Sequence, residues 1–288
     1  MQIVTDSGTD ISLSNEDQQE LNIHVVPLNV SLGNVTYREG VDIQPAEFYP
    51  LLAETEDMPT TSQPSAGEFA DVYKKILEYD PDILSIHISS GLSGTYNSAL
   101  AAAQMLPDNN ITVMDAKTLS AAAGWQVEAA ARAVKKGWSM EDVKSLVARI
   151  STASDSIYTL NELKYLIHGG RISHMKGLIA SILNIKPLIG VEKEGGTYVQ
   201  LGQSRTFKRA VQGLVNIISE KHPPGSELRV QVLHSFNFEG AAMLKDLIDK
   251  TFKCTWLPEG HISLVLGAHT GPSMIGAAYA RQEEFAGL

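Results

Sequence analysis

Apolar positions along the chain form short runs separated by polar turns, and the central run covers residues 82–88. Its β-branched and apolar residues predict a buried strand. Ten residues rich in glycine and hydroxyl side chains follow at 89–98, and the alanine-rich segment 99–106 then favours a helix. The pattern predicts a strand, a tight connection and a helix, around which the rest of the chain is organised.

The first half of the chain repeats this alternation of apolar runs and amphipathic segments. Further strands are predicted at residues 2–5, 23–30 and 111–115. Helices are predicted at residues 15–20, 45–53, 65–78, 118–136 and 139–150. Ser65 and Ser139 have the spacing of capping boxes. Strands that alternate with helices require right-handed crossovers, so we expect an α/β structure with a parallel sheet.

The pattern changes near residues 151–156, where serine, threonine and aspartate cluster as at a junction between domains. Beyond it, strands are predicted at residues 157–160, 186–191, 197–201, 228–234 and 262–266. Helices are predicted at residues 162–168, 174–183, from about 205 to 221, and at 239–252. We therefore divide the chain into two α/β domains, 1–153 and 154–288.

Composition narrows the class of protein. The 288 residues are enough for two domains, and 43% hydrophobic with 19% charged residues indicates a globular chain. A net charge of −10 argues against a general nucleic-acid binder. The single cysteine, Cys254, can form neither an internal disulfide nor a cysteine metal site. The chain has no signal-peptide pattern and no apolar run that approaches a membrane span, so we expect a cytoplasmic protein.

Hydroxyl side chains gather in two connections. Ser93 and Thr95 lie where the helix after the central strand begins, and free N–H groups at such a point hold an anion well. Thr60, Thr61 and Ser62 lie between two prolines and can form a second hydroxyl-rich wall. Both groups have an ordinary alternative, because serine and threonine commonly cap helices and stabilise turns.

The sequence has no motif that assigns catalysis. It lacks a nucleophile elbow, a phosphate-binding GxxxxGK[ST] loop, a GxGxxG loop after a strand and an HExxH metal pair. His269 follows an apolar run in a glycine-rich turn, where its side chain can face a crevice. Arg171 follows two glycines, and its guanidinium can bind a carboxylate or phosphate through two N–H groups or form an ordinary surface ion pair.

Taken together, several stretches resemble the DegV family, the fatty-acid-binding carrier components of bacterial fatty acid kinases. The similar stretches occur in the family's order along nearly the whole chain. They are Thr5-Asp6-Ser7, Pro59-Thr60-Thr61-Ser62-Gln63-Pro64-Ser65, Ser90-Gly91-Leu92-Ser93-Gly94-Thr95-Tyr96, Gly169-Gly170-Arg171-Ile172, Lys186-Pro187, Arg205 and the turn 267–272. The resemblance implies an N-terminal α/β/α domain with a parallel sheet and a C-terminal α/β domain with a mixed sheet.

The resemblance also implies a function. One long-chain fatty acid lies between the domains, and its carboxylate is held by Thr61, Ser62, Ser93 and Gly94. The resemblance implies no catalytic residue, cofactor or metal in this protein. It further implies that the protein presents the carboxyl group to a separate ATP-dependent kinase and then carries the acyl-phosphate for phospholipid synthesis. A transient contact with a membrane surface stays open. The kinase-facing or phosphoryl-facing residues implied by the resemblance are Arg171, Arg205 and His269.

Two other functions stay open from the residues. The first is a phosphotransferase or hydrolase that uses His269 or Ser93 directly, since folds of this kind host many activities. The second is a regulator that binds a small anion, which requires a compact polar pocket in place of an apolar tunnel.

Overall fold

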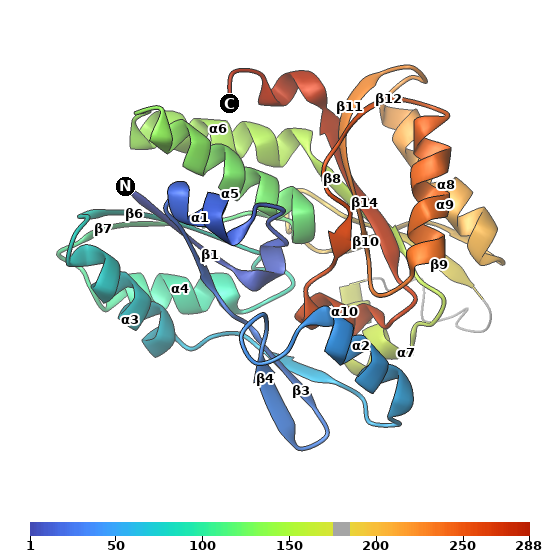
Figure 1. Ribbon diagram of the computed structural model, residues 1–288, viewed down its shortest axis with the longest axis horizontal. Coiled ribbons are helices and arrows are strands. Elements are labelled where there is room, and N and C mark those ends of the chain that lie inside the picture. Colours follow the sequence, from blue (N-terminus) through green and yellow to red (C-terminus); the bar gives the residue numbers. More distant parts are fainter. Residues whose placement is uncertain (175–184) are drawn as a thin grey trace.

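The computed structural model describes residues 1–174 and 185–288. Its strands form two large sheets and one small sheet, and helices pack on the faces of the large sheets (Figure 1). Except for its first residue, the helix predicted over residues 174–183 lies outside the described residues. Within the described parts of the chain, no helix has both the length and the apolar character needed to cross a membrane.

The first large sheet is parallel, with the strand order β2-β1-β6-β7. Its strands are β1 (Gln2–Asp6), β2 (Ile23–Val26), β6 (Asp82–His87) and β7 (Asn110–Asp115). The helices of this half are α1 (Asn15–Glu20), α3 (Ala66–Leu77), α4 (Thr95–Gln104), α5 (Ser120–Lys135) and α6 (Met140–Ala153). Helices α3 and α4 lie on one side of the sheet, and α5 and α6 lie on the other (Figure 1). The predicted α/β/α arrangement is confirmed.

Local signals set the ends of several helices. The Ser65 hydroxyl accepts the backbone N–H of Glu68, and the Glu68 carboxylate accepts the backbone N–H of Ser65, which confirms the predicted capping box of α3. Ser139 caps α6 by accepting the backbone N–H of Asp142 at 3.2 Å. Both caps fix where a helix leaves its loop.

A small antiparallel sheet projects from the first half, with the order β4-β3-β5. Its elements, with the helix beside them, are β3 (Asn29–Leu32), β4 (Val35–Arg38), β5 (Thr60–Ser62) and α2 (Pro45–Glu54). The single strand predicted over residues 23–30 is wrong, because the chain divides there into β2 and β3, which belong to different sheets. Pro27 lies at the break, since proline has no N–H to donate to a strand ladder.

The second large sheet has the order β10-β9-β8-β14-β11-β12, with β13 paired to β11. Its strands are β8 (Asp155–Thr159), β9 (Lys186–Val191), β10 (Tyr198–Ser204), β11 (Glu227–His234), β12 (Lys253–Trp256), β13 (Gly260–His261) and β14 (Ile275–Arg281). Its helices are α7 (Lys164–His168), α8 (Phe207–Lys221), α9 (Phe238–Asp249) and α10 (Leu264–Thr270). Strands β12 and β13 run parallel to β11 and the other neighbours are antiparallel, so the predicted mixed sheet is confirmed.

The strand predicted over residues 262–266 is wrong. That run enters helix α10, and the last strand is β14, which lies near the centre of the second sheet. A short apolar run does not distinguish a buried strand from a buried helix, and every residue of α10 is buried. Strand β14 is rich in glycine and alanine, which have low strand propensity, and it is stabilised by pairing with β8 and β11.

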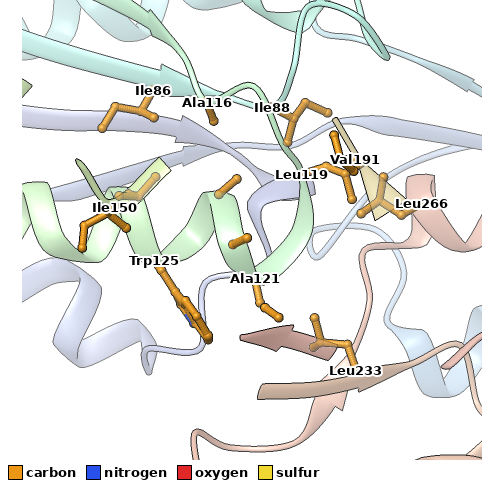
Figure 2. Close-up of a cluster of buried hydrophobic side chains, with 14 of the residues drawn as sticks. Ile86, Ile88, Ala116, Leu119, Ala121, Trp125, Ile150, Val191, Leu233 and Leu266 are labelled. Carbon is orange, nitrogen blue, oxygen red and sulfur yellow. The ribbon is translucent and has the colours of Figure 1, made fainter. Parts of the chain in front are cut away.

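Helix α5 packs between the two large sheets. Trp125 on α5 donates its indole N–H to Oε1 of Gln231 on β11 at 3.0 Å. Figure 2 shows Trp125 in one hydrophobic cluster with Ile86 of the first sheet and Leu233 of the second. The predicted domain boundary at residues 153/154 falls between α6 and β8, and the division into two domains stays a prediction.

Candidate functional site

Four segments from both halves of the chain meet around one small cavity. Strand β5 brings Thr61 and Ser62, the connection from β6 to α4 brings Ser93, the segment after α7 brings Arg171, and α10 brings His269. The cavity has a volume of about 40 Å³. Its other lining residues are Leu28, Gln63, Ile88, Leu92, Leu119, Tyr198, Val265 and Leu266. The cavity therefore combines a polar group of side chains with an apolar wall.

Ser93 lies beside the start of α4. Its hydroxyl is 2.8 Å from the hydroxyl of Thr95 and accepts the backbone N–H of Thr95 at 3.3 Å. Gly94 is the N-cap residue of α4 and offers no side-chain cap. Ser93 thus partly replaces the missing cap and also lines the cavity, and its role in holding an anion stays a prediction.

Thr61 and His269 are joined across the cavity. The threonine hydroxyl is 2.8 Å from Nε2 of the histidine, although 208 positions separate the two residues in the chain. Burial lowers the pKa of His269 to about 4, and the charges of Arg171 and His168 add to this effect. The imidazole is therefore neutral at pH 7 and can take part in hydrogen bonds to a ligand without supplying a counter-charge.

Gly169 fixes the position of the His269 ring. A Cβ atom at Gly169 would lie 2.0 Å from Nδ1 of His269, a distance that side chains do not reach. Within the described residues, Nδ1 is buried and has no hydrogen-bond partner. Gly169 thus allows the histidine ring to pack directly against the backbone.

Arg171 begins the short 3-10 helix η2 (Arg171–His174). It donates from Nη1 to the carbonyl oxygen of Gly169 at 2.7 Å and from Nε to that of Leu92 at 3.4 Å. Arg171 also lines a more open cleft of about 410 Å³ on the outer side of Ser93. The guanidinium and Ser93 therefore border both the small cavity and the outer cleft.

Gly94 and Gln63 form a contact that sequence reasoning missed. A Cβ atom at Gly94 would lie 2.8 Å from Nε2 of Gln63, so the glycine allows the amide to approach the start of α4. Gln63 lies in the predicted hydroxyl-rich segment, and its position there was the available signal. Tyr198, another lining residue, comes from β10 and had no comparable signal in the sequence.

Arg205 lies apart from the residues above. It is exposed in the turn between β10 and α8, and it lines neither the small cavity nor the outer cleft as the described residues define them. Its kinase-facing role stays a prediction.

A series of buried hydrogen bonds at the first sheet has the residue types of a catalytic triad. Nδ1 of His87 is 2.9 Å from the Asp6 carboxylate, and Nε2 is 2.7 Å from the hydroxyl of Ser85. Ser85 is also 2.8 Å from the hydroxyl of Tyr73. Ser85 and His87 have no exposed surface, so these hydrogen bonds stabilise the sheet and offer no nucleophile to a ligand.

Comparison with protein families decides the class of protein. A model of the family described as "Uncharacterised protein, DegV family" matches residues 1–282. The chain belongs to the DegV family. The resemblance noted from the sequence motifs is confirmed.

Curated DegV relatives extend over nearly the same length. A DegV domain-containing protein of Staphylococcus aureus strain N315 is 36% identical over 274 residues, which are 95% of this chain and 96% of the relative. Another, from Deinococcus radiodurans, is 32% identical over 280 residues, covering 96% of this chain and 94% of the relative.

Solved DegV structures share the whole fold. A Thermus thermophilus DegV protein described by its fatty acid binding is 30% identical with a TM-score of 0.85, over 97% of this chain and 99% of the other. The fatty-acid-binding DegV of Bacillus subtilis is 28% identical with a TM-score of 0.85, over 98% and 99%. A stearic acid-binding protein of Eubacterium ventriosum is 28% identical with a TM-score of 0.80, over the full length of both chains.

Proposed function

We propose that this DegV protein binds one long-chain fatty acid, with the carboxyl group at Thr61, Ser62, Ser93 and Gly94. The observation that carries the proposal is the meeting of hydroxyl side chains, a guanidinium and an apolar wall around one cavity. Solved DegV structures that bind fatty acids and match nearly the whole chain support it. The lining residues come from both predicted domains, 1–153 and 154–288, so the ligand lies between them.

The polar end of the cavity suits a carboxylate. A carboxylate that leaves water is costly unless several donors satisfy it. The hydroxyls of Thr61 and Ser93 can turn to donate, and Arg171 provides a permanent positive charge beside them. The free N–H groups at the start of α4 add to the attraction for an anion.

The apolar wall suits the acyl chain. Burying about fourteen methylene groups contributes roughly 11 kcal/mol before the costs of ordering are subtracted. A cavity of about 40 Å³ has room for the headgroup and not for a whole acyl chain. The acyl chain therefore enters the cavity as the apolar side chains of the wall move apart.

The proposal includes presentation of the carboxyl group to a separate ATP-dependent kinase, after which this protein carries the acyl-phosphate. Ser93 and Arg171 border both the cavity and the outer cleft, so a kinase docked at the cleft can reach the carboxyl group. Arg171 and His269 contact the phosphoryl group, and the exposed Arg205 contributes positive charge for the kinase.

The first test is mass spectrometry of the intact protein under native conditions, followed by solvent extraction of the ligand. We expect one long-chain fatty acid per chain. The Ser93→Ala variant loses one hydrogen bond to a charged group, worth about 1.5–3 kcal/mol, and its dissociation constant for oleate should rise about 10- to 100-fold. Calorimetric titration of delipidated protein measures this change.

Ser145→Ala is the matched control, because the Ser145 hydroxyl is exposed on α6 and bonds only its own helix. It should bind oleate as the wild type does. Equal oleate affinity in the Ser93→Ala variant would reject the carboxylate site. Formation of acyl-phosphate from ATP by this chain alone would reject a separate kinase and favour an enzyme.

A further inference from the structure

Helix α10 lines the cavity, and carboxylates from the opposite end of the chain hold its first residues. Asp10 accepts the backbone N–H of Ser263 at 2.7 Å. Glu39 accepts the Ser263 hydroxyl at 2.8 Å and the backbone N–H of Leu264. The first N–H groups of a helix have no partner within the helix, so the two carboxylates supply partners that α10 lacks.

Glu39 reaches a second part of the apolar wall. Its carboxylate accepts the hydroxyl of Ser7 at 2.6 Å, and the same hydroxyl accepts the backbone N–H of Leu28 at 3.0 Å. Leu28 is one of the apolar residues of the cavity. One carboxylate therefore connects the Leu28 segment to the start of α10.

Asp10 reaches a third part of the wall. It accepts the Ser120 hydroxyl at 2.5 Å, and Ser120 directly follows Leu119, which lines the cavity. Both Asp10 and Ser120 have left-handed backbones, with φ of 47° and 56°. Residues other than glycine keep that conformation only where their surroundings enforce it, and the bond between these two side chains is such a constraint.

We propose that Asp10 and Glu39 are positioning residues for the acyl-chain wall, which they hold by joining α10 to the Leu28 and Leu119 segments. This inference rests on the proposed function, because the acyl chain is the ligand that must part the wall. A wall fixed in advance does not have to be ordered when lipid binds, so the network lowers the cost of binding and slows release.

Glu39 is the residue to change. Asp10 has a left-handed backbone, and its replacement by alanine would add strain unrelated to the network. Glu39→Ala removes the acceptor for Ser263, Leu264 and Ser7. Glu39→Gln keeps a carbonyl acceptor for the Leu264 N–H and gives the two serines an amide to bond.

Two measurements test the proposal. Hydrogen exchange followed by mass spectrometry reports the opening of residues 264–270 in lipid-free protein. Transfer of oleate to phosphatidylcholine vesicles reports the release rate. In Glu39→Ala we expect exchange of the α10 amides and oleate release each to rise about tenfold, while Glu39→Gln stays within about threefold of the wild type.

Ser139→Ala is the control for a general loss of stability. It removes the cap of α6, a helix that does not line the cavity. Its α10 exchange and its oleate release should match the wild type. If Glu39→Ala does not fold, Ser263→Ala removes only the hydroxyl contact to Glu39, and we expect about threefold increases.

The outcomes separate the two proposals. Unchanged α10 exchange in Glu39→Ala would overturn the positioning role, whatever the ligand. Faster exchange with unchanged release from a wild type that does bind oleate would overturn the link to the acyl chain. A wild type that binds no oleate would overturn both the proposed function and that link.

Discussion

Among the described residues that line the cavity, one side chain carries a permanent charge and the others are neutral. Arg171 carries the charge, whereas the lowered pKa of His269 leaves its ring neutral at pH 7. The hydroxyls of Thr61 and Ser93 complete the polar end. A carboxylate placed among these groups adds a negative charge within reach of the ring, and a negative charge favours the protonated form of a histidine.

We therefore expect fatty acid binding to raise the pKa of His269 from about 4. In the lipid-free protein the folded pKa is below the usual 6.5, so this ring makes the fold lose stability as the pH falls from about 6.5 toward 4, where the unfolded chain binds the proton first. NMR titration of the ring with and without oleate measures both values. His222, which lines neither the cavity nor the cleft, is the reference. An unchanged His269 pKa at saturating oleate would contradict the assigned carboxylate site.

The contact between Gly169 and His269 gives a second prediction at this scale. In Gly169→Ala the new methyl group displaces the ring, because the two would lie 2.0 Å apart. We expect a loss of about 1–3 kcal/mol in the free energy of unfolding, with oleate binding about tenfold weaker. Urea denaturation and calorimetric titration measure the two effects.

Gly67→Ala is the matched control for this substitution. Gly67 lies in α3, where a Cβ atom has an ordinary 3.7 Å contact with Ser65, and alanine favours a helix. Its oleate affinity should equal that of the wild type. An equally small effect of Gly169→Ala would show that the histidine ring can move without consequence.

Helices and strands that carry local sequence signals could be predicted from the sequence. Strands β1, β6, β7, β9 and β10 follow from the periodicity of the sequence, and the caps at Ser65 and Ser139 follow from capping residues. Thr61, Ser62 and Ser93, which line the cavity, were also singled out from the sequence, because hydroxyl residues cluster between two prolines and at the start of a helix.

Elements that depend on distant contacts were not predictable. The start of helix α10 depends on Asp10 and Glu39, which accept hydrogen bonds from Ser263 and Leu264, and no residue near α10 in the sequence indicates these partners. The pairing of β14 with both neighbours likewise outweighs its weak strand propensity. The contribution of Tyr198 to the cavity depends on the same long-range packing.

At the scale of the whole molecule, α5 makes the two halves interdependent. Most of its residues are buried, and its cluster includes side chains from both large sheets. Trp125 is its largest buried side chain and reaches Gln231 on β11. Loss of this side chain removes packing from both sheets at once.

Trp125→Ala should lower the free energy of unfolding by about 3–5 kcal/mol, because it leaves a large cavity and an unpaired Gln231. Urea denaturation followed by circular dichroism measures the change. Trp138→Ala is the control, since Trp138 is 41% exposed, and it should change stability by less than about 1 kcal/mol. Similar effects of the two substitutions would contradict a shared core.

The contacts that anchor α10 also have a consequence for the order of events during synthesis. The ribosome makes Asp10 and Glu39 early, and their partners at Ser263 and Leu264 emerge more than 220 residues later. The wall that includes Leu28 and Leu119 cannot close until nearly the whole polypeptide has been translated. The proposed fatty acid site is therefore complete only when nearly all of the chain has been made.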